Sequence, residues 1–290
     1  MEQWQLLKEV DTWTDKVTKI SNKNTGDKNT GDKNAFVRFQ KIENLNVYGI
    51  LEDQIIHEIE GSIYKSFKKT GDTYKLDKVK LLMPCEPMNI YCVGLNFQEH
   101  IDELGLDKHN QPANFMKPVT GVIDPGEKII IPAVAKRVDY EGEMALVIKD
   151  KIKDISIDQA MEHVLGITPL NDVTEREMSY DYTQVTYCKS FDTFTSFGPV
   201  IDTEIDPDNT VIRTYLNGEK VQEGHTKDFL FSCSYIVSYF SQGRTLYPGD
   251  IISTGTPSHV LGMKDGDRIE VEVEGIPIRL INHVYDSKMY

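Results

Sequence analysis

The order of strand-like and helix-like segments from residue 90 onward constrains the fold most. Strands are indicated by NIYCVGLN, KIIIPAV, MALVIKD, SFGPVID, TVIRTYLNG, DIISTGT and RIEVEVEG, which are rich in β-branched and apolar residues. Helices are indicated only by FQEHIDELG, SIDQAMEHVLG and LFSCSYIVSYFSQG. Because strands outnumber helices and the two do not alternate strictly, the sequence predicts an α+β fold with a mixed or antiparallel sheet wrapped on itself.

Residues 1–84 are predicted to form a small strand-rich N-terminal domain, followed by a larger domain over residues 85–290. AFVRF, NVYGILE and QIIHEIEG read as short strands, and Pro84 and Pro87 mark the junction. Within the first domain, residues 24–33 repeat NTGDK and contain no apolar side chain to bury. This repeat predicts a flexible excursion on the surface.

The composition excludes several classes of protein. With 32 Lys+Arg against 46 Asp+Glu, the net charge is −14, and no basic cluster offsets it, which argues against nucleic-acid binding. No apolar run approaches the roughly 20 residues of a membrane span, and the N-terminus lacks the features of a signal peptide. The four cysteines show no CxxC spacing, which disfavours a thiolate zinc site and suits a reducing compartment. We therefore expect a cytoplasmic protein without membrane contact.

Familiar catalytic motifs are missing from the sequence. It has no GxSxG, GxxxxGK[ST] or HExxH motif and no GxGxxG after a strand. Serine hydrolases, P-loop enzymes, zincins and dinucleotide-binding enzymes are therefore disfavoured.

Carboxylates in the segment VDYEGEMALVIKD form the first candidate site. If the strand begins before Asp139, then Asp139, Glu141 and Glu143 project from one face. Carboxylates crowded in this way need a cation, a proton or open water, and oxygen ligands favour Mg²⁺, Mn²⁺ or Ca²⁺ over Zn²⁺. Asp172, in a loop after an apolar run, is available as a third ligand or as a helix cap.

The alternative is an ordinary strand with a solvated face. Glu270, Glu272 and Glu274 in RIEVEVEG show the same alternation, with valines filling the other face. We interpret this later trio as the solvated case.

The second candidate site is the pair His100 and Glu103 on the first predicted helix. Asn96 is suited to cap that helix, Glu99 to complete a capping box, and Gly105 to end it. At a spacing of three residues the Glu103 carboxylate can orient the imidazole, which could then activate water as a general base. The alternative is a surface ion pair.

Lys189, within CKSFDTF, is the third candidate. Its ammonium could neutralise a substrate carboxylate or an oxyanion, or it could simply pair with Asp192.

Together these segments resemble the fumarylacetoacetate hydrolase family from about residue 88 to residue 284. The matching segments are VGLNFQEHIDELG, FMKPVT, DYEGEMALVI, GITPLNDVTERE, KSFDTFTSFGPVI, LNGEKVQEGHTKDFLFS and LYPGDIISTGTP. The resemblance implies a mixed β-sandwich roll that holds a metal ion, in a protein that is usually a homodimer.

The resemblance also implies roles for individual residues. Glu141, Glu143 and Asp172 fall on the metal ligands, with one Mg²⁺ or Mn²⁺ per subunit, and Asp139 falls outside this set. His100 and Glu103 fall on a catalytic pair carried by a lid-like helix that orders over the substrate, and Lys189 lies near the substrate. The implied substrate contacts are Arg176, Gln222 and Thr256. The chain departs from the family where TGTPSHVLG carries His259 and Leu261 in place of glycine.

The activity that the resemblance implies is hydrolysis of a carbon–carbon bond in a small β-diketo acid of the acylpyruvate or fumarylacetoacetate type. His100 would deprotonate a water molecule, Lys189 would offset negative charge, and a Lewis-acid metal would stabilise the enolate. Because the same platform serves several outcomes, an oxaloacetate-type decarboxylase or a keto–enol isomerase is the alternative enzyme. The non-enzymatic alternative is a metal-holding binding protein.

Overall fold

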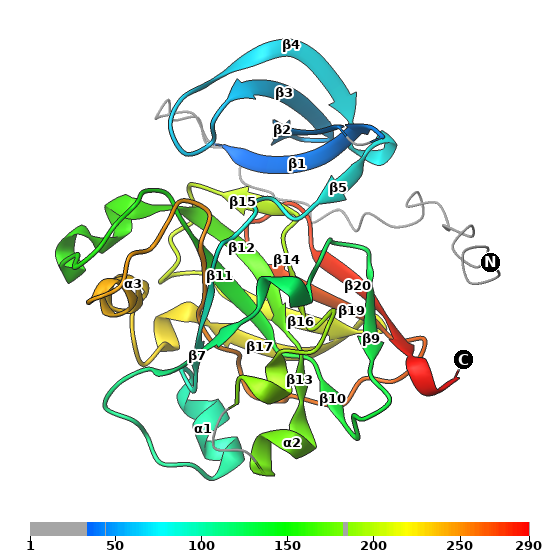
Figure 1. Ribbon diagram of the computed structural model, residues 1–290, viewed down its shortest axis with the longest axis vertical. Helices are drawn as coiled ribbons and strands as arrows, with labels where there is room; N and C mark the ends of the chain where they lie inside the picture. Colours follow the sequence, from blue (N-terminus) through cyan, green and yellow to red (C-terminus); the bar gives the residue numbers. More distant parts are fainter. Residues whose placement is uncertain (1–33, 44, 182–184, 290) are drawn as a thin grey trace.

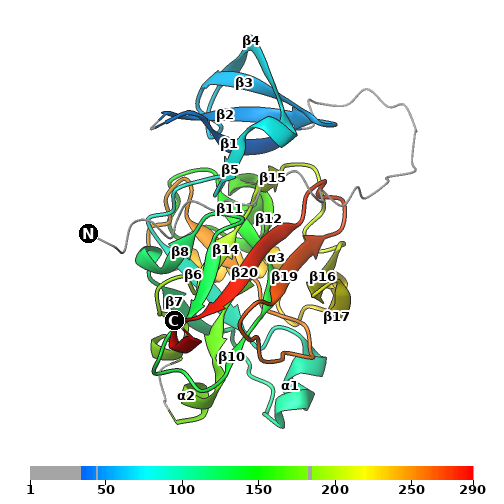
Figure 2. The same ribbon diagram turned by 90° about the vertical axis from the view of Figure 1, so that its right-hand side faces the viewer.

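The computed structural model of the chain describes residues 34–43, 45–181 and 185–289, so the NTGDK repeat lies outside the described residues. A small group of N-terminal strands lies above a larger body in which sheets predominate over helices (Figures 1 and 2). No described helix combines the length and apolar character needed to cross a bilayer. The cysteines are free and buried: Cys85, Cys92, Cys188 and Cys233.

The N-terminal strands form an antiparallel meander that continues into the main sheet. One edge of β1 pairs with β2, and its other edge is shared between β15, over Ala35–Val37, and β5, over Arg38–Gln40. The predicted strands of this region are confirmed. The boundary between domains at residues 84 and 85 stays a prediction. The elements are β1 (Ala35–Ile42), β2 (Leu45–Glu52), β3 (Ile55–Gly61), β4 (Phe67–Lys75) and β5 (Lys80–Leu82).

The main sheet has 13 strands and runs in the order β4-β3-β2-β1-β15-β12-β11-β18-β6-β7 along its path. Two pairs, β18 with β6 and β14 with β8, are parallel, and β12 pairs antiparallel with β11, so the sheet is mixed. Its remaining strands are β6 (Ile90–Gly94), β7 (Ala113–Lys117), β8 (Val122–Ile123), β11 (Gly142–Ile148), β12 (Val164–Asp172), β14 (Thr195–Phe197), β15 (Val200–Asp202) and β18 (Ile251–Ser253).

A second sheet of five strands packs against the first and completes the predicted mixed β-sandwich. Met144, Leu146 and Ile148 of β11 share a core with Val271 and Val273 of this sheet, whereas the alternate residues of β11 face another core. The central strand is therefore apolar because both of its faces are buried. The sheet contains β17 (Glu219–His225), β16 (Val211–Leu216), β19 (Arg268–Val273), β20 (Leu280–Asp286) and β9 (Lys128–Ile131), and a separate pair joins β10 (Val138–Asp139) to β13 (Thr174–Glu175).

The helices are short and lie outside the sheets (Figure 1). The predicted helix in SIDQAMEHVLG is wrong beyond one 3₁₀ segment, because β12 begins at Val164 and pairs with β11. The segment LFSCSYIVSYFSQG does form a helix, which Ser232 caps through its side chain. The α-helices are α1 (Gln98–Leu104), α2 (Arg176–Asp181) and α3 (Cys233–Ser241), and the 3₁₀ segments are η1 (Leu76–Lys78), η2 (Val119–Gly121), η3 (Ile157–His163), η4 (Tyr187–Lys189), η5 (Thr226–Asp228) and η6 (Ser287–Met289).

The boundaries of α1 confirm one predicted signal and correct another. Gly105 ends the helix in the left-handed conformation with a φ of 65°, as predicted. Asn96 does not cap the start, where Phe97 occupies the cap position. Its side chain instead accepts from the main-chain N–H of Phe231 and donates to the carbonyl of Thr254, at 2.9 and 2.8 Å. Asn96 thus fixes the chain before α1 to two distant segments.

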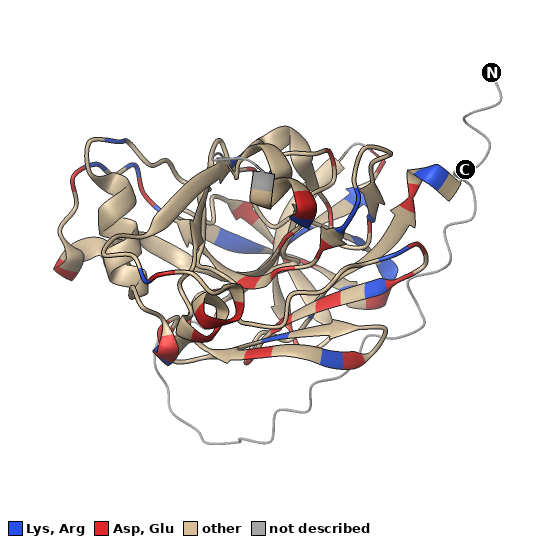
Figure 3. Cartoon of the chain, turned by 90° about the horizontal axis from the view of Figure 1, so that it is seen from below, with Lys and Arg blue, Asp and Glu red and all other residues tan. Residues whose placement is uncertain are grey.

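The glutamates of β19 correct the prediction of a solvated strand face. Glu270 and Glu272 are only 2% and 5% exposed. Arg213 lies opposite Glu272 on β16 and donates to it at 3.0 Å, and Arg279 donates to both carboxylates. Arginine side chains cover these carboxylates with their apolar stems. Basic and acidic positions accordingly lie side by side on neighbouring strands (Figure 3).

Candidate active site

Three buried carboxylates converge where β11 begins and β12 ends. Oxygen atoms of Glu141, Glu143 and Asp172 all lie within 4.8 Å of one another. Antiparallel pairing places Gly142 of β11 opposite Asn171 of β12, and the N–H of Asp172 donates to the carbonyl of Glu141 at 2.8 Å. The sheet therefore brings together residues that the sequence separates by about thirty positions.

Two details of the predicted strand are wrong. The strand is not continuous, because β10 ends at Asp139 and β11 begins at Gly142. Asp139 consequently belongs to a separate strand pair and lies outside the carboxylate cluster. Asp172 is the last residue of β12 and caps no helix.

The glycine between the two glutamates is required by close packing. A Cβ at Gly142 would lie 1.9 Å from the hydroxyl oxygen of Thr214 on β16. The Gly142 N–H donates to Gln222 at 3.2 Å, and its carbonyl accepts from Thr256 at 3.0 Å. Gln222 and Thr256, expected to contact substrate, thus hold the backbone between two carboxylates. Their contact with substrate stays a prediction.

Two buried lysines border the cluster. Lys189 donates to Glu141 and Asp172 at 2.6 and 2.7 Å and to the hydroxyl of Thr174 at 2.8 Å. These contacts contradict the alternative in which Lys189 pairs simply with Asp192. Lys117, at the end of β7, donates to Asp172 and to the carbonyl of Phe194, and its side chain is completely buried.

Lys117 was missed from the sequence. Its only signal is an isolated lysine between Met116 and Pro118 in the segment FMKPVT. Ser253 and Gly255 were missed as well: the serine hydroxyl and the glycine N–H both donate to one oxygen of Glu143. Nothing in the pattern around these two residues distinguishes them from ordinary strand and turn residues.

Arg176 connects the cluster to Asp139. Its guanidinium donates to Glu141 and, at 2.9 Å, to Asp139, which also accepts from Arg137 at 2.8 Å. Asp139 thereby supports a residue that contacts a carboxylate of the cluster. The expected contact of Arg176 with substrate stays a prediction.

The crowding shifts the pKa values of Glu143 and Glu141 in opposite directions. Burial raises the pKa of Glu143 to about 8, and the charges of Asp172 and Glu141 add to this rise. Burial alone would also raise the pKa of Glu141, but Lys189 and Arg176 reverse the effect and hold it below its ordinary value. The cluster therefore retains one carboxyl group that needs a proton or a cation at neutral pH.

This donor set fits a hard divalent cation. All three groups offer oxygen atoms: each oxygen of Glu141 and Asp172 accepts from one basic side chain and keeps a further lone pair, and the two donors to Glu143 bind only one of its oxygens. A cation placed among Glu141, Glu143 and Asp172 would also relieve the repulsion that raises the pKa of Glu143. Mg²⁺, Mn²⁺ and Ca²⁺ are the ions that such ligands suit.

The predicted pair on α1 combines a buried imidazole with a partly exposed carboxylate. His100 is 4% exposed, and its Nδ1 lies 3.1 Å from Oε2 of Glu103. A positive charge on this imidazole would lower the pKa of Glu141, which places the ring near the cluster. A surface ion pair is therefore not what the structure shows, because the imidazole is buried.

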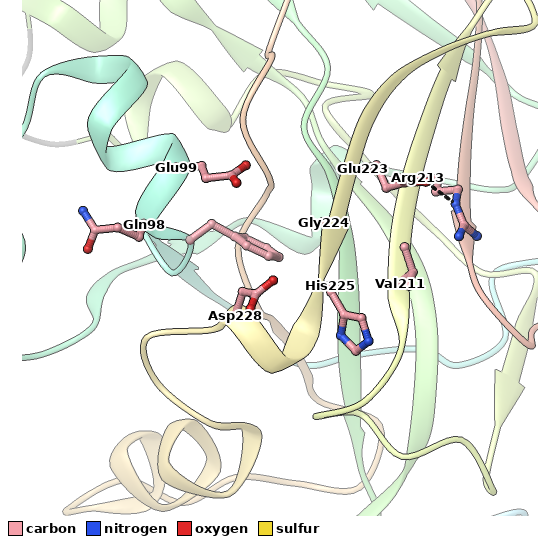
Figure 4. A pocket seen from close by; sticks show the side chains of 9 residues that line it. Gln98, Glu99, Val211, Arg213, Glu223, Gly224, His225 and Asp228 are labelled. Atoms are coloured by element: carbon pink, nitrogen blue, oxygen red, sulfur yellow. Dashed lines mark hydrogen bonds and ion pairs between the residues drawn. The ribbon is translucent and has the colours of Figure 1, made fainter.

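A separate cavity of about 630 Å³ lies beside the start of α1 (Figure 4). It is lined by residues from the start of α1 and from the hairpin of β16 and β17, and it includes none of the predicted site residues. Its lining residues are Phe97, Gln98, Glu99, Val211, Arg213, Glu223, Gly224, His225 and Asp228.

Comparison with known protein families identifies the family of this chain. The model of the fumarylacetoacetate (FAA) hydrolase C-terminal family matches residues 89–285, which include the whole cluster and α1. The chain belongs to the fumarylacetoacetate hydrolase family. A second family, described as Rv2993c-like, N-terminal, matches residues 35–84.

Relatives in the fumarylacetoacetate hydrolase family carry several different activities. Human mitochondrial oxaloacetate tautomerase FAHD2A is 35% identical over 71% of this chain and 70% of its own. A 2-hydroxyhepta-2,4-diene-1,7-dioate isomerase from Mycobacterium marinum has a TM-score of 0.81 at 32% identity, covering 88% of this chain and 99% of its own. A fumarylacetoacetate hydrolase from Exiguobacterium antarcticum has a TM-score of 0.78 at 32% identity, covering 87% and 99%. The family thus supports an enzyme that acts on a small molecule, while the reaction differs among its members.

Proposed function

We propose that this protein is a Mg²⁺- or Mn²⁺-dependent enzyme that hydrolyses a carbon–carbon bond in a small β-diketo acid of the acylpyruvate or fumarylacetoacetate type. The observation that carries the proposal is a buried histidine, paired with Glu103, near a cluster of three carboxylates bordered by buried lysines. A binding protein would need the cluster but would have no use for a buried base beside it.

Different residues have different roles in the proposed reaction. Glu141, Glu143 and Asp172 hold the ion, which when bound acts as a Lewis acid toward the oxygens of an α-keto acid. Glu103 accepts the Nδ1 proton of His100, so the Nε2 atom keeps its lone pair and can take a proton from water. Lys189 remains protonated, because Asp172 and Glu141 raise its pKa despite its burial, and it offsets negative charge as the bond breaks.

The second candidate is tautomerisation or isomerisation of an oxo acid. The specific observation in its favour is that the human tautomerase and the Mycobacterium marinum isomerase resemble this chain as closely as the hydrolase does. In this reaction His100 would remove a proton from a carbon atom next to the keto group and return it elsewhere. The same cluster and the same base would serve both reactions.

Absorbance assays of an acylpyruvate and of oxaloacetate separate these candidates. Each assay uses the purified protein with Mg²⁺ or Mn²⁺ and a chelated sample beside it. Metal-dependent loss of the acylpyruvate with release of a carboxylic acid supports the hydrolase. Keto–enol conversion of oxaloacetate without loss of CO₂ supports the tautomerase, and loss of CO₂ indicates a decarboxylase. No metal-dependent change with either compound contradicts the hydrolase.

A histidine variant separates enzyme from binding protein. We expect His100→Ala to lower kcat by about 10²–10⁴-fold, the usual contribution of a general base, while calorimetry shows unchanged metal affinity. His225→Ala is the matched control, because His225 lines the cavity beside the start of α1 and lies outside the site. The proposal includes a homodimer with one ion per subunit, which light scattering and metal analysis test.

A further inference from the structure

The turn that contains His259 is hydrogen-bonded both to the pair on α1 and to the residue before Glu141. The main-chain N–H of His259 donates to both carboxylate oxygens of Glu103, at 3.0 Å each. Its carbonyl accepts from the hydroxyl of Tyr140 at 3.1 Å. Tyr140 is fully buried and directly precedes Glu141. His259 is thus hydrogen-bonded to Glu103 and to Tyr140, which precedes the first carboxylate of the cluster.

The rest of the turn is fixed to the start of β11. The amide of Gln222 donates to the carbonyls of Pro257 and Ser258 at 2.9 and 3.2 Å. The same side chain accepts from the N–H of Gly142, between Glu141 and Glu143. The position of the turn is therefore set by the backbone of the cluster.

By contrast, α1 has few other attachments. It has seven residues, of which only His100 and Ile101 are buried. The cavity of about 630 Å³ borders its start, where Phe97, Gln98 and Glu99 are among the lining residues (Figure 4). The hydroxyl of Ser258 reaches Glu99 at 3.4 Å, which adds a weak second link to the same turn. The hydrogen bonds from the turn therefore contribute much to the orientation of the Glu103 side chain.

His259 makes these bonds from an uncommon backbone conformation. Its φ is 71°, in the left-handed region that glycine adopts freely and β-branched residues avoid. Its side chain is exposed and contacts the hydroxyl of Ser258 at 3.0 Å, whereas the bonds to Glu103 and Tyr140 come from the main chain. A non-glycine residue here accepts a conformational cost that the two main-chain hydrogen bonds offset.

We propose that His259 is a positioning residue. Its main chain, in the left-handed conformation, holds Glu103, and through Glu103 the imidazole of His100, in a fixed position relative to the three carboxylates. The kinetic part of the test rests on the proposed function. The structural part does not, because it needs no substrate.

The test compares two substitutions that both remove the imidazole but have opposite preferences at a positive φ. His259→Val disfavours the left-handed conformation, so amide hydrogen exchange over residues 98–104 is expected to rise and kcat to fall about tenfold, with KM changing little. His259→Gly, which accepts the conformation, is expected to restore slow exchange and most of kcat. Leu261→Val is the matched control, because Leu261 is an exposed residue of the same loop whose φ is not in the left-handed region.

Each outcome decides the proposal. Equal loss in the valine and glycine variants would assign the effect to the imidazole and overturn the main-chain role. Unchanged exchange and unchanged kcat in His259→Val would overturn positioning altogether. Tyr140→Phe gives a second measurement at the other end of the link and is expected to raise exchange over the same helix. If exchange responds as expected but no oxo acid is turned over, the proposed function fails while the positioning role stands.

Discussion

Lys117 places its ammonium on the carboxylate of Asp172, and both side chains are almost completely buried, at 0% and 1% exposure. The same ammonium donates to the carbonyls of Val173 and Phe194 at 3.1 and 2.8 Å. The end of β12 therefore depends on a cation supplied by β7.

Removing that cation should destabilise the fold. In Lys117→Met the buried Asp172 loses one of its two lysine donors and two carbonyls lose theirs, so we expect a loss of about 3 kcal/mol in the free energy of unfolding. Denaturant titration in the presence of chelator measures it. Lys41→Met is the control, because Lys41 pairs with Glu58 near the surface and its loss should change stability far less. Equal effects of the two substitutions would contradict the structural role of Lys117.

Neutralising Glu143 should weaken metal binding without weakening the fold. Glu143→Gln removes a charge that its neighbours repel, and its amide oxygen can still accept from Ser253 and Gly255. We expect metal affinity to fall by more than the roughly 10–100-fold typical of an outer-shell loss, while stability in chelator is unchanged or higher. Calorimetry and thermal unfolding measure the two quantities. The control Glu272→Gln, which breaks a buried pair with Arg213 and Arg279, should lower stability and leave metal affinity unchanged.

Metal binding should become more stabilising as pH rises. The pKa of Glu143 is raised from 4.5 to about 8, so the folded state holds a proton that the unfolded state loses. That proton's contribution to stability is complete below pH 4.5 and disappears as pH rises through about 8. A divalent cation must displace it, so the increase in Tm caused by Mg²⁺ should grow from pH 6 to pH 8. A pH-independent increase, or an identical pH dependence in Glu143→Gln, would count against this assignment.

A methyl group at Gly142 should disrupt the site. The added Cβ would overlap the hydroxyl of Thr214, and relief requires moving the backbone between Glu141 and Glu143. We expect Gly142→Ala to cost about 3 kcal/mol of stability and to abolish measurable metal binding. Gly94→Ala is the control, because the nearest atom to its Cβ would lie at 3.7 Å, in ordinary contact. Wild-type affinity in Gly142→Ala would show that the site tolerates the shift.

The strands were predictable because their buried faces leave a local mark in the sequence. Met144 to Ile148 reads as apolar, and the structure buries both faces of that strand. The first part of β12 was misread because residues 157–163 satisfy a helical pattern, whereas the strand from Val164 depends on pairing with distant β11. A local pattern contains no information on which partner strand a segment will find.

Residue patterns named Glu141, Glu143 and His100 as candidates, and the family resemblance supplied the full set of expected ligands. Spacing favoured a cation site at Glu141 and Glu143 and a solvated face at Glu270 and Glu272, yet both pairs proved to be buried. The difference lies in what surrounds them, because arginines neutralise the second pair, while Glu143 has no cationic partner among its hydrogen-bond donors. Lys117 could not be found, since its partner Asp172 is 55 residues away in the sequence.

The pairing of β1 with β15 has a consequence for how the chain can be divided. Phe36 of β1 lies opposite Ile201 and packs in the same core as Phe197 and Ile251. A fragment that begins at residue 85 would therefore leave β15 as an open edge beside exposed apolar side chains. Such edges template strand pairing between molecules. Strand β1 thus covers an edge that would otherwise promote aggregation. We expect the isolated C-terminal part to aggregate even though it contains every residue of the candidate active site.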